Sequence, residues 1–207
     1  SYVPDDGLET DLETYLRGQA GMLADASRFD RRHLVFHVLA AGWMAAAQGR
    51  DDLAHAALDA VDSYPELTGF PANADMARVL RAELALQAGE ADKAVDILAS
   101  RNAVGEELYL AHVVRMRALE AAGDPAGALA QAEWLRSHRG LAYVEFNSLN
   151  ILQPVNVIES NLALGSAARL AAQLGRPELA ATRQAEFESA WPGQKNMDVV
   201  ARRFGAD

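Results

Sequence analysis

The residue types that most often carry chemistry are sparse in this sequence, and a single pair has a suggestive spacing. The chain has no cysteine and five histidines. His33 and His37 lie four residues apart, so both imidazole rings would share one face of a helix. A zinc site needs further ligands, and the metalloprotease pattern places a glutamate directly after the first histidine, where this chain has Leu34. We therefore predict no metal site.

Other catalytic patterns are missing from the sequence as well. It contains no glycine-rich phosphate loop and no dinucleotide fingerprint, and the serines lack the glycine context of a hydrolase nucleophile. Paired acids at residues 51–52 and 106–107 stand in expected loops or at helix starts, where they favour the helix dipole. We therefore predict a protein that is not an enzyme and needs no cofactor.

Composition and charge narrow the classes of partner. The chain has 207 residues, 50% of them hydrophobic, and the dominance of alanine and leucine favours helices over strands. The formal net charge of −10 argues against nucleic acid and anionic membranes, which both attract basic surfaces. The longest apolar run, Val38 to Ala47, falls far short of the roughly 18 residues of a membrane span. We expect a cytoplasmic protein with a protein or peptide partner, and the abrupt acidic start suggests a piece of a longer protein.

The stretch from Glu106 to Arg136 has the pattern of a helical hairpin. Apolar residues recur at helical spacing on both sides of a short break. In that break, Gly123 suits the left-handed turn that ends a helix, Asp124 suits the cap of the next helix, and Pro125 suits its first turn. The pattern predicts two antiparallel helices.

The same break recurs three more times, which makes this hairpin the unit of a repeat. In each unit an alanine follows the turn glycine five residues later, and small residues let two helix axes approach closely. The glycine–alanine pairs are Gly49–Ala54, Gly89–Ala94, Gly123–Ala128 and Gly175–Ala180. Successive glycines are 40, 34 and 52 residues apart, so the last interval holds one 34-residue repeat and an 18-residue insertion.

These hairpins resemble tetratricopeptide repeats, in which the inter-helix turn often carries glycine and a small residue follows in the second helix. Gly42 occupies a further position at which that family prefers a small residue, whereas Met116 departs from the preference. The early tryptophan and later tyrosine of the family are missing from the first helices. The resemblance implies an all-α, right-handed solenoid of about four antiparallel helix hairpins with flanking helices.

The chain divides into three parts on this reading. Residues 1–30 form an acidic lead-in with a capping helix, expected from about Leu8 to Ala24. Residues 31–191 form the repeat domain, with an irregular insertion near 140–154 and a loop at Gly69–Pro71. Residues 192–207 form a tail with one short helix, Asp198 to Phe204.

Four asparagines stand between Asn147 and Asn161, close to the insertion. Asn156 and Glu159 have the spacing of a capping box, with Asn156 as the N-cap. One cap does not account for four amides, and buried amides need hydrogen-bond partners. These amides therefore either fasten the insertion or face a ligand.

Solenoids of helix pairs usually bind along a concave surface lined by the first helix of each pair. In the present register that surface holds seven candidate residues: Trp43, Glu83, Gln87, Arg117, Asn161, Arg169 and Gln173. Arg117 and Arg169 stand at equivalent positions and would form a positive island in an acidic chain. With Asn161 they would hold an acidic or C-terminal peptide group, unless Glu83 and Glu159 neutralise them.

Two functions follow from this reading. The first is a module that binds a protein, a peptide or a second copy of itself through the concave face. The second is a regulatory or scaffolding region of a larger bacterial signalling or peptide-modification enzyme. It is suggested by Ala142 to Leu164, which are similar to the C-terminal repeat region of bacterial cyclase-like proteins; any cyclase activity would reside outside this chain. An exposed apolar patch on the first or last hairpin favours the second function, and a polar groove favours the first.

Overall fold

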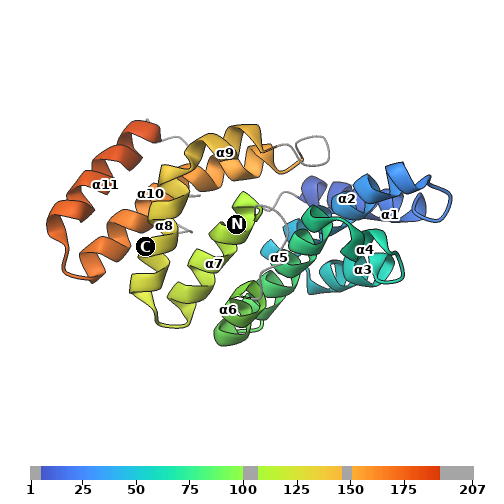
Figure 1. The fold of residues 1–207 in the computed structure, drawn as a ribbon, viewed down its shortest axis with the longest axis horizontal. Coiled ribbons are helices and arrows are strands. Elements are labelled where there is room, and N and C mark those ends of the chain that lie inside the picture. Colours follow the sequence, from blue (N-terminus) through green and yellow to red (C-terminus); the bar gives the residue numbers. More distant parts are fainter. Residues whose placement is uncertain (1–5, 100–106, 146–150, 192–207) are drawn as a thin grey trace.

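All regular structure in the described part of the chain is α-helical, as the composition predicted. The computed structural model describes residues 6–99, 107–145 and 151–191, and these ranges contain no strand (Figure 1). In chain order the helices of these ranges are α1 (Asp6–Gly21), α2 (Arg28–Ala47), α3 (Asp51–Val61), α4 (Glu66–Gly69), α5 (Pro71–Gln87), α6 (Ala91–Ala99), α7 (Tyr109–Ala121), α8 (Pro125–Ser137), α9 (Arg139–Val144), α10 (Gln153–Gln173) and α11 (Pro177–Ala190).

Four hairpins, α2–α3, α5–α6, α7–α8 and α10–α11, each turn on a glycine in the left-handed region. Their φ angles are 75° at Gly49, 75° at Gly89, 80° at Gly123 and 68° at Gly175. In the third hairpin the Gly123 amide donates to the Glu120 carbonyl at 3.0 Å, and the next amide donates to the Leu119 carbonyl at 2.8 Å. This pattern closes the end of α7 and recurs at the other three turns. The predicted role of the turn glycines is confirmed.

The start of the second helix also follows its sequence in the third hairpin. Asp124 caps α8, because its side chain accepts a hydrogen bond from the Gly127 amide at 2.9 Å. Pro125 occupies the first turn of the helix, where its missing N–H leaves no bond unmade. Both assignments agree with the sequence.

Small residues bring the helices of each pair together. A Cβ atom added to Gly42 would lie 2.5 Å from Cβ of Ala57, so α2 and α3 touch at this point. Ala54, Ala94 and Ala128 are fully buried. Ala180 is only half-buried against the core, because no further helix of the described chain covers α11.

Several boundaries differ from the sequence expectation. The predicted loop at Gly69–Pro71 is reduced to Phe70, because the short helix α4 precedes it and α5 begins at Pro71. The insertion near 140–154 is not irregular throughout, since α9 occupies Arg139–Val144. The predicted helix Asp198–Phe204 lies outside the described residues.

The helices follow one another along an elongated molecule, from α1 and α2 at one end to α11 at the other (Figure 1). One core of buried apolar side chains extends from Leu16 on α1 to Ala171 on α10. A smaller cluster of Leu162, Leu164 and Phe187 joins α10 to α11, so the last helix has an apolar anchor of its own. None of the described helices is long and apolar enough to cross a membrane.

Candidate functional site

Four of the seven candidate residues meet at one buried carboxylate. Glu83 on α5 is completely buried. Its Oε2 accepts hydrogen bonds from Nη1 of Arg117 on α7 at 2.6 Å and from Nε1 of Trp43 on α2 at 3.3 Å. Its Oε1 accepts from Nη2 of Arg117 at 2.9 Å and from Nε2 of Gln87 at 3.0 Å. We call this set the Glu83 brace.

The Glu83 brace ties three successive hairpins together. Trp43, Glu83 and Arg117 each stand six residues before the turn glycine of their hairpin, so one repeat position supplies all three side chains. The paired hydrogen bonds from Arg117 compensate the buried carboxylate, which would otherwise be very costly to bury. Because this cation and its anion satisfy each other, Arg117 contributes no net positive charge to a groove.

The remaining three candidates lie elsewhere. Arg169 pairs with Glu120, Nη1 to Oε1 at 2.6 Å, and about a third of each side chain is exposed. Asn161 accepts a hydrogen bond from Nη2 of Arg139 on α9. Gln173, at the end of α10, is exposed. The expected positive island is therefore absent from these positions, and the partner of Arg169 is Glu120 rather than Glu159.

Asn156 does not cap a helix, which corrects the capping-box interpretation. The helix α10 begins three residues earlier, at Gln153, and Leu152 is its cap. The buried Asn156 side chain instead donates from Nδ2 to Oε2 of Glu145 at 2.9 Å. Oε1 of Glu145 accepts from the Tyr109 amide at the start of α7, at 2.7 Å. Through Glu145, the side-chain amide of Asn156 therefore fastens the insertion to the repeat core. Asn147 and Asn150 lie outside the described residues.

A second charged cluster surrounds Glu107, whose sequence position suggested only a helix start. Its carboxylate accepts two hydrogen bonds from Arg115, at 2.8 and 3.0 Å, and one from Arg78 at 3.0 Å. Burial raises the pKa of Glu107, but the hydrogen bonds from Arg115 and Arg78 outweigh burial and lower the pKa to about 2. Arg78 also binds Asp75, so this cluster joins α5 to the start of α7 as a structural contact.

The two histidines singled out by their spacing lie on α2, facing α1. The Nδ1 atom of His37 is 3.1 Å from the hydroxyl of Tyr15 and 3.3 Å from Oε1 of Gln19. His33 accepts a hydrogen bond from Nε of Arg32 at 3.2 Å, and burial lowers its pKa. No three metal-ligating side chains come together among the described residues. Both rings instead help to line a pocket.

That pocket, here called the α1–α2 pocket, is an apolar cavity of about 870 Å³ between the end of α1 and the start of α2. Its walls also include Met22, Asp25, Phe29, Asp30, Arg32 and Leu34. Phe29 is 63% exposed and Met22 is 49% exposed, so both side chains are accessible beside the pocket. The guanidinium of Arg32 lies 4.2 Å from the centre of the Phe29 ring, a cation–π contact.

Sequence reasoning missed the α1–α2 pocket. Its one signal was Phe29, a large apolar residue between Arg28 and Asp30 at the break before the first repeat. An isolated exposed aromatic carries little information, because most protein surface is apolar. The cavity arises from the way α1 packs on α2, and no pattern within either helix records that contact.

Comparison with known proteins finds no relative of this chain. No family model matches the chain, and no curated protein and no solved structure matches it. The likeness to tetratricopeptide repeats therefore rests on the glycine turns and small residues of the chain itself.

Proposed function

We propose that this protein is a tetratricopeptide-like interaction module that holds an apolar segment of a partner protein in the α1–α2 pocket. The observation that carries the proposal is the exposure of Phe29 and Met22 beside an apolar cavity of about 870 Å³. Concave, mainly apolar pockets with polar groups at their edge are where proteins often bind ligands, and exposed apolar patches mark protein interaction sites. Burying each of these side chains fully would contribute up to roughly 1.5–3 kcal/mol.

The pocket supports this role better than the residues first expected on a concave face. Trp43, Glu83 and Arg117 already satisfy one another, so a partner would have to break buried hydrogen bonds to reach them. Breaking such bonds costs free energy without exposing a new apolar surface. Phe29 and Met22 are exposed, so a partner reaches their side chains without breaking a buried hydrogen bond.

A scaffolding role within a larger multidomain protein is the second candidate. It is favoured because the pocket is lined by residues of α1 and α2, the helices at one end of the molecule (Figure 1). An apolar patch at an end suits packing against a neighbouring domain. In that case the segment held by the pocket belongs to the same polypeptide.

Photo-crosslinking tests the proposal directly. A benzophenone amino acid replaces Phe29 in one variant and Tyr143 in a control, because Tyr143 is an exposed aromatic residue on α9. We expect a protein crosslink from position 29 that is absent from position 143 and is lost when Met22 is changed to Asp. Identical products from both positions would contradict the proposal. A neighbouring domain of the same polypeptide in the crosslink would select the second candidate.

A further inference from the structure

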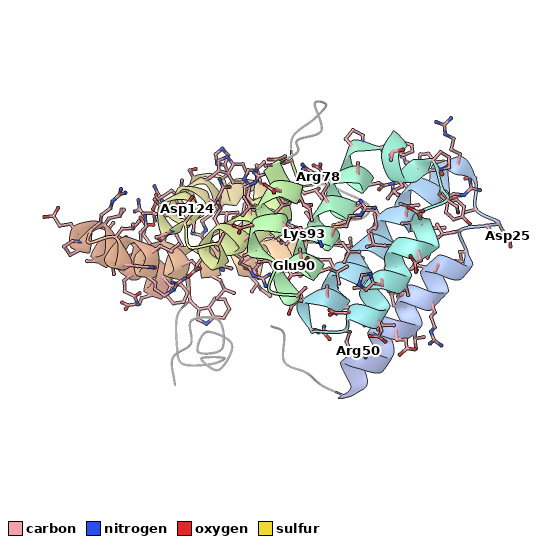
Figure 2. All side chains as sticks on the ribbon, turned by 90° about the horizontal axis from the view of Figure 1, so that it is seen from below. Asp25, Arg50, Arg78, Glu90, Lys93 and Asp124 are labelled. Atoms are coloured by element: carbon pink, nitrogen blue, oxygen red, sulfur yellow. The ribbon has the colours of Figure 1, made fainter. Side chains whose placement is uncertain are left out.

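The charges around the α1–α2 pocket restrict the segment that fits it. Asp25 and Asp30 lie on the pocket wall with exposed side chains, and Asp25 projects from the end of the molecule (Figure 2). Within the described chain neither carboxylate forms an ion pair, although Asp30 accepts a hydrogen bond from the Ser27 hydroxyl. Arg32 is the one arginine among the lining residues, which include no lysine, and its guanidinium lies over the Phe29 ring.

His33 also lines the pocket. Burial lowers the pKa of His33, with the charge of Arg32 adding to this effect and the carboxylate of Asp30 opposing it. Asp25 and Asp30 give the pocket lining two carboxylates against the one guanidinium of Arg32, on a surface that is mainly apolar. A segment with an apolar stripe and flanking basic residues is complementary to it.

The chain itself contains such a segment at its C-terminal end. Residues 192–207 lie outside the described part, so their sequence is the basis of the argument. Apolar residues recur there at helical spacing: Met197, Val200, Ala201 and Phe204. The basic residues Lys195, Arg202 and Arg203 outnumber Asp198 and Asp207, which gives this segment a net charge of +1 in a chain of net charge −10.

The position of the two features favours a second copy of the chain as the source of this segment. The residues that line the α1–α2 pocket belong to α1, α2 and the turn between them. These two helices lie at one end of the molecule, and α11 lies at the other (Figure 1). We propose that the C-terminal segment of one copy docks in the α1–α2 pocket of another, with Phe204 as its apolar anchor. This step rests on the proposed function, because it names the segment that the pocket holds.

Such a contact joins two different surfaces, so it is heterologous and can extend from copy to copy. The full chain should therefore show a mass that rises with concentration through dimers and larger species in analytical ultracentrifugation. A synthetic peptide of residues 192–207 should compete for the pocket and return the chain to monomers. A buried aromatic anchor typically contributes enough that its loss weakens association roughly 30-fold or more.

Two complementary variants make the test sharp. Phe29→Asp damages the pocket and keeps the C-terminal segment, whereas Phe204→Asp damages the segment and keeps the pocket. Each variant alone should be monomeric, and an equimolar mixture should form a dimer and nothing larger, because each pair has a single intact contact. Tyr143→Asp should assemble like the unmodified chain, and circular dichroism checks that all variants remain folded.

The outcomes separate this inference from the proposed function. A monomeric full chain at all concentrations, or a mixture of the two variants that stays monomeric, overturns the inference, as does a peptide that fails to compete. If the crosslink from position 29 to another protein is still found in that case, the proposed function stands with a different segment. If both results are negative, the pocket has neither role.

Discussion

Arg117 and Arg169 occupy the same repeat position, yet their partners differ in burial. Glu83 is completely buried, whereas about a third of Glu120 is exposed. Changing Arg117 to Ala leaves a buried carboxylate without its cation, and we expect the free energy of unfolding to fall by roughly 2–4 kcal/mol. The matched change Arg169→Ala should cost less than about 1 kcal/mol, because exposed ion pairs contribute little. Urea denaturation of both variants measures the difference.

A second variant isolates the charge from the packing. In a Glu83→Gln background the uncompensated negative charge is gone, so the change of Arg117 to Ala should cost less than it does beside the native carboxylate. Equal costs in the two backgrounds, or equal costs for the two arginines, would show that the Glu83 brace does not stabilise the chain through its charge.

Glu107 makes the stability of the protein depend on acid pH. Its pKa of about 2 in the folded chain lies below the ordinary value of 4.5, so its contribution is present above pH 4.5 and is lost as the pH falls toward 2. We expect the native chain to lose more unfolding free energy over this range than Glu107→Gln. Burial raises the pKa of the neighbouring Asp75, so the titration of Asp75 changes the stability in the opposite direction as the pH falls. The unfolding free energies of the native chain and of Glu107→Gln are therefore compared at each pH. If the unfolding free energies of the two proteins fall equally with pH, Glu107 does not have a lowered pKa in the folded chain.

At the scale of the elements, the turn glycines define the hairpins. Gly123 has a φ of 80°, a conformation that costs other residues about 1–2 kcal/mol. We expect Gly123→Ala to destabilise the chain by about that amount. Gly18 in α1 has open space around its Cα atom and no positive φ, so Gly18→Ala should be neutral or stabilise the helix by up to about 1 kcal/mol. Thermal unfolding measures the stability of both variants. A similar loss of stability in Gly123→Ala and Gly18→Ala would show that the positive φ of Gly123 is not the cause.

The elements also show which features a sequence can specify. Turn glycines and caps are local, so four hairpins could be placed from residue chemistry, including the cap at Asp124. The short helices α4 and α9 escaped prediction, because one or two turns contain too few residues for a periodic pattern. The role of Asn156 was predicted wrongly because a local pattern was present but not used. The spacing of Asn156 to Glu159 matches a capping box, whereas its actual partner, Glu145, precedes the helix.

The candidate site shows the same limit. Repeat register put Trp43, Glu83 and Arg117 on one face, and the structure brings them together. The repeat register does not indicate how deeply a side chain is buried, however. It therefore could not show that these three side chains bind one another instead of facing a partner. The α1–α2 pocket depends on helix packing, which no single helix encodes.

At the scale of the whole molecule, the described helices share one continuous core, to which α11 adds only the partly buried Leu179 and Ala180. Phe187 is its one buried residue, within the small cluster that also holds Leu162 and Leu164. In arrays where each unit contacts its neighbours, the end unit opens at lower free energy than the middle. We therefore expect the amides of α11 to exchange with solvent faster than those of α7.

Hydrogen exchange followed by mass spectrometry tests this attachment with two core substitutions. Removing a buried phenylalanine costs roughly 3–5 kcal/mol. Phe187 is the one buried side chain of α11, which otherwise packs through the partly buried Leu179 and Ala180 and pairs Arg183 with Glu133. Phe187→Ala should therefore strip protection from α11 and leave α7 protected. Leu135 is fully buried on α8, which packs against α7 and against α10, and α10 in turn packs against α11. Leu135→Ala should therefore lower protection in α7 directly and in α11 through α10. If Phe187→Ala lowers protection equally in α7 and α11, the molecule unfolds as one cooperative unit and α11 belongs fully to it.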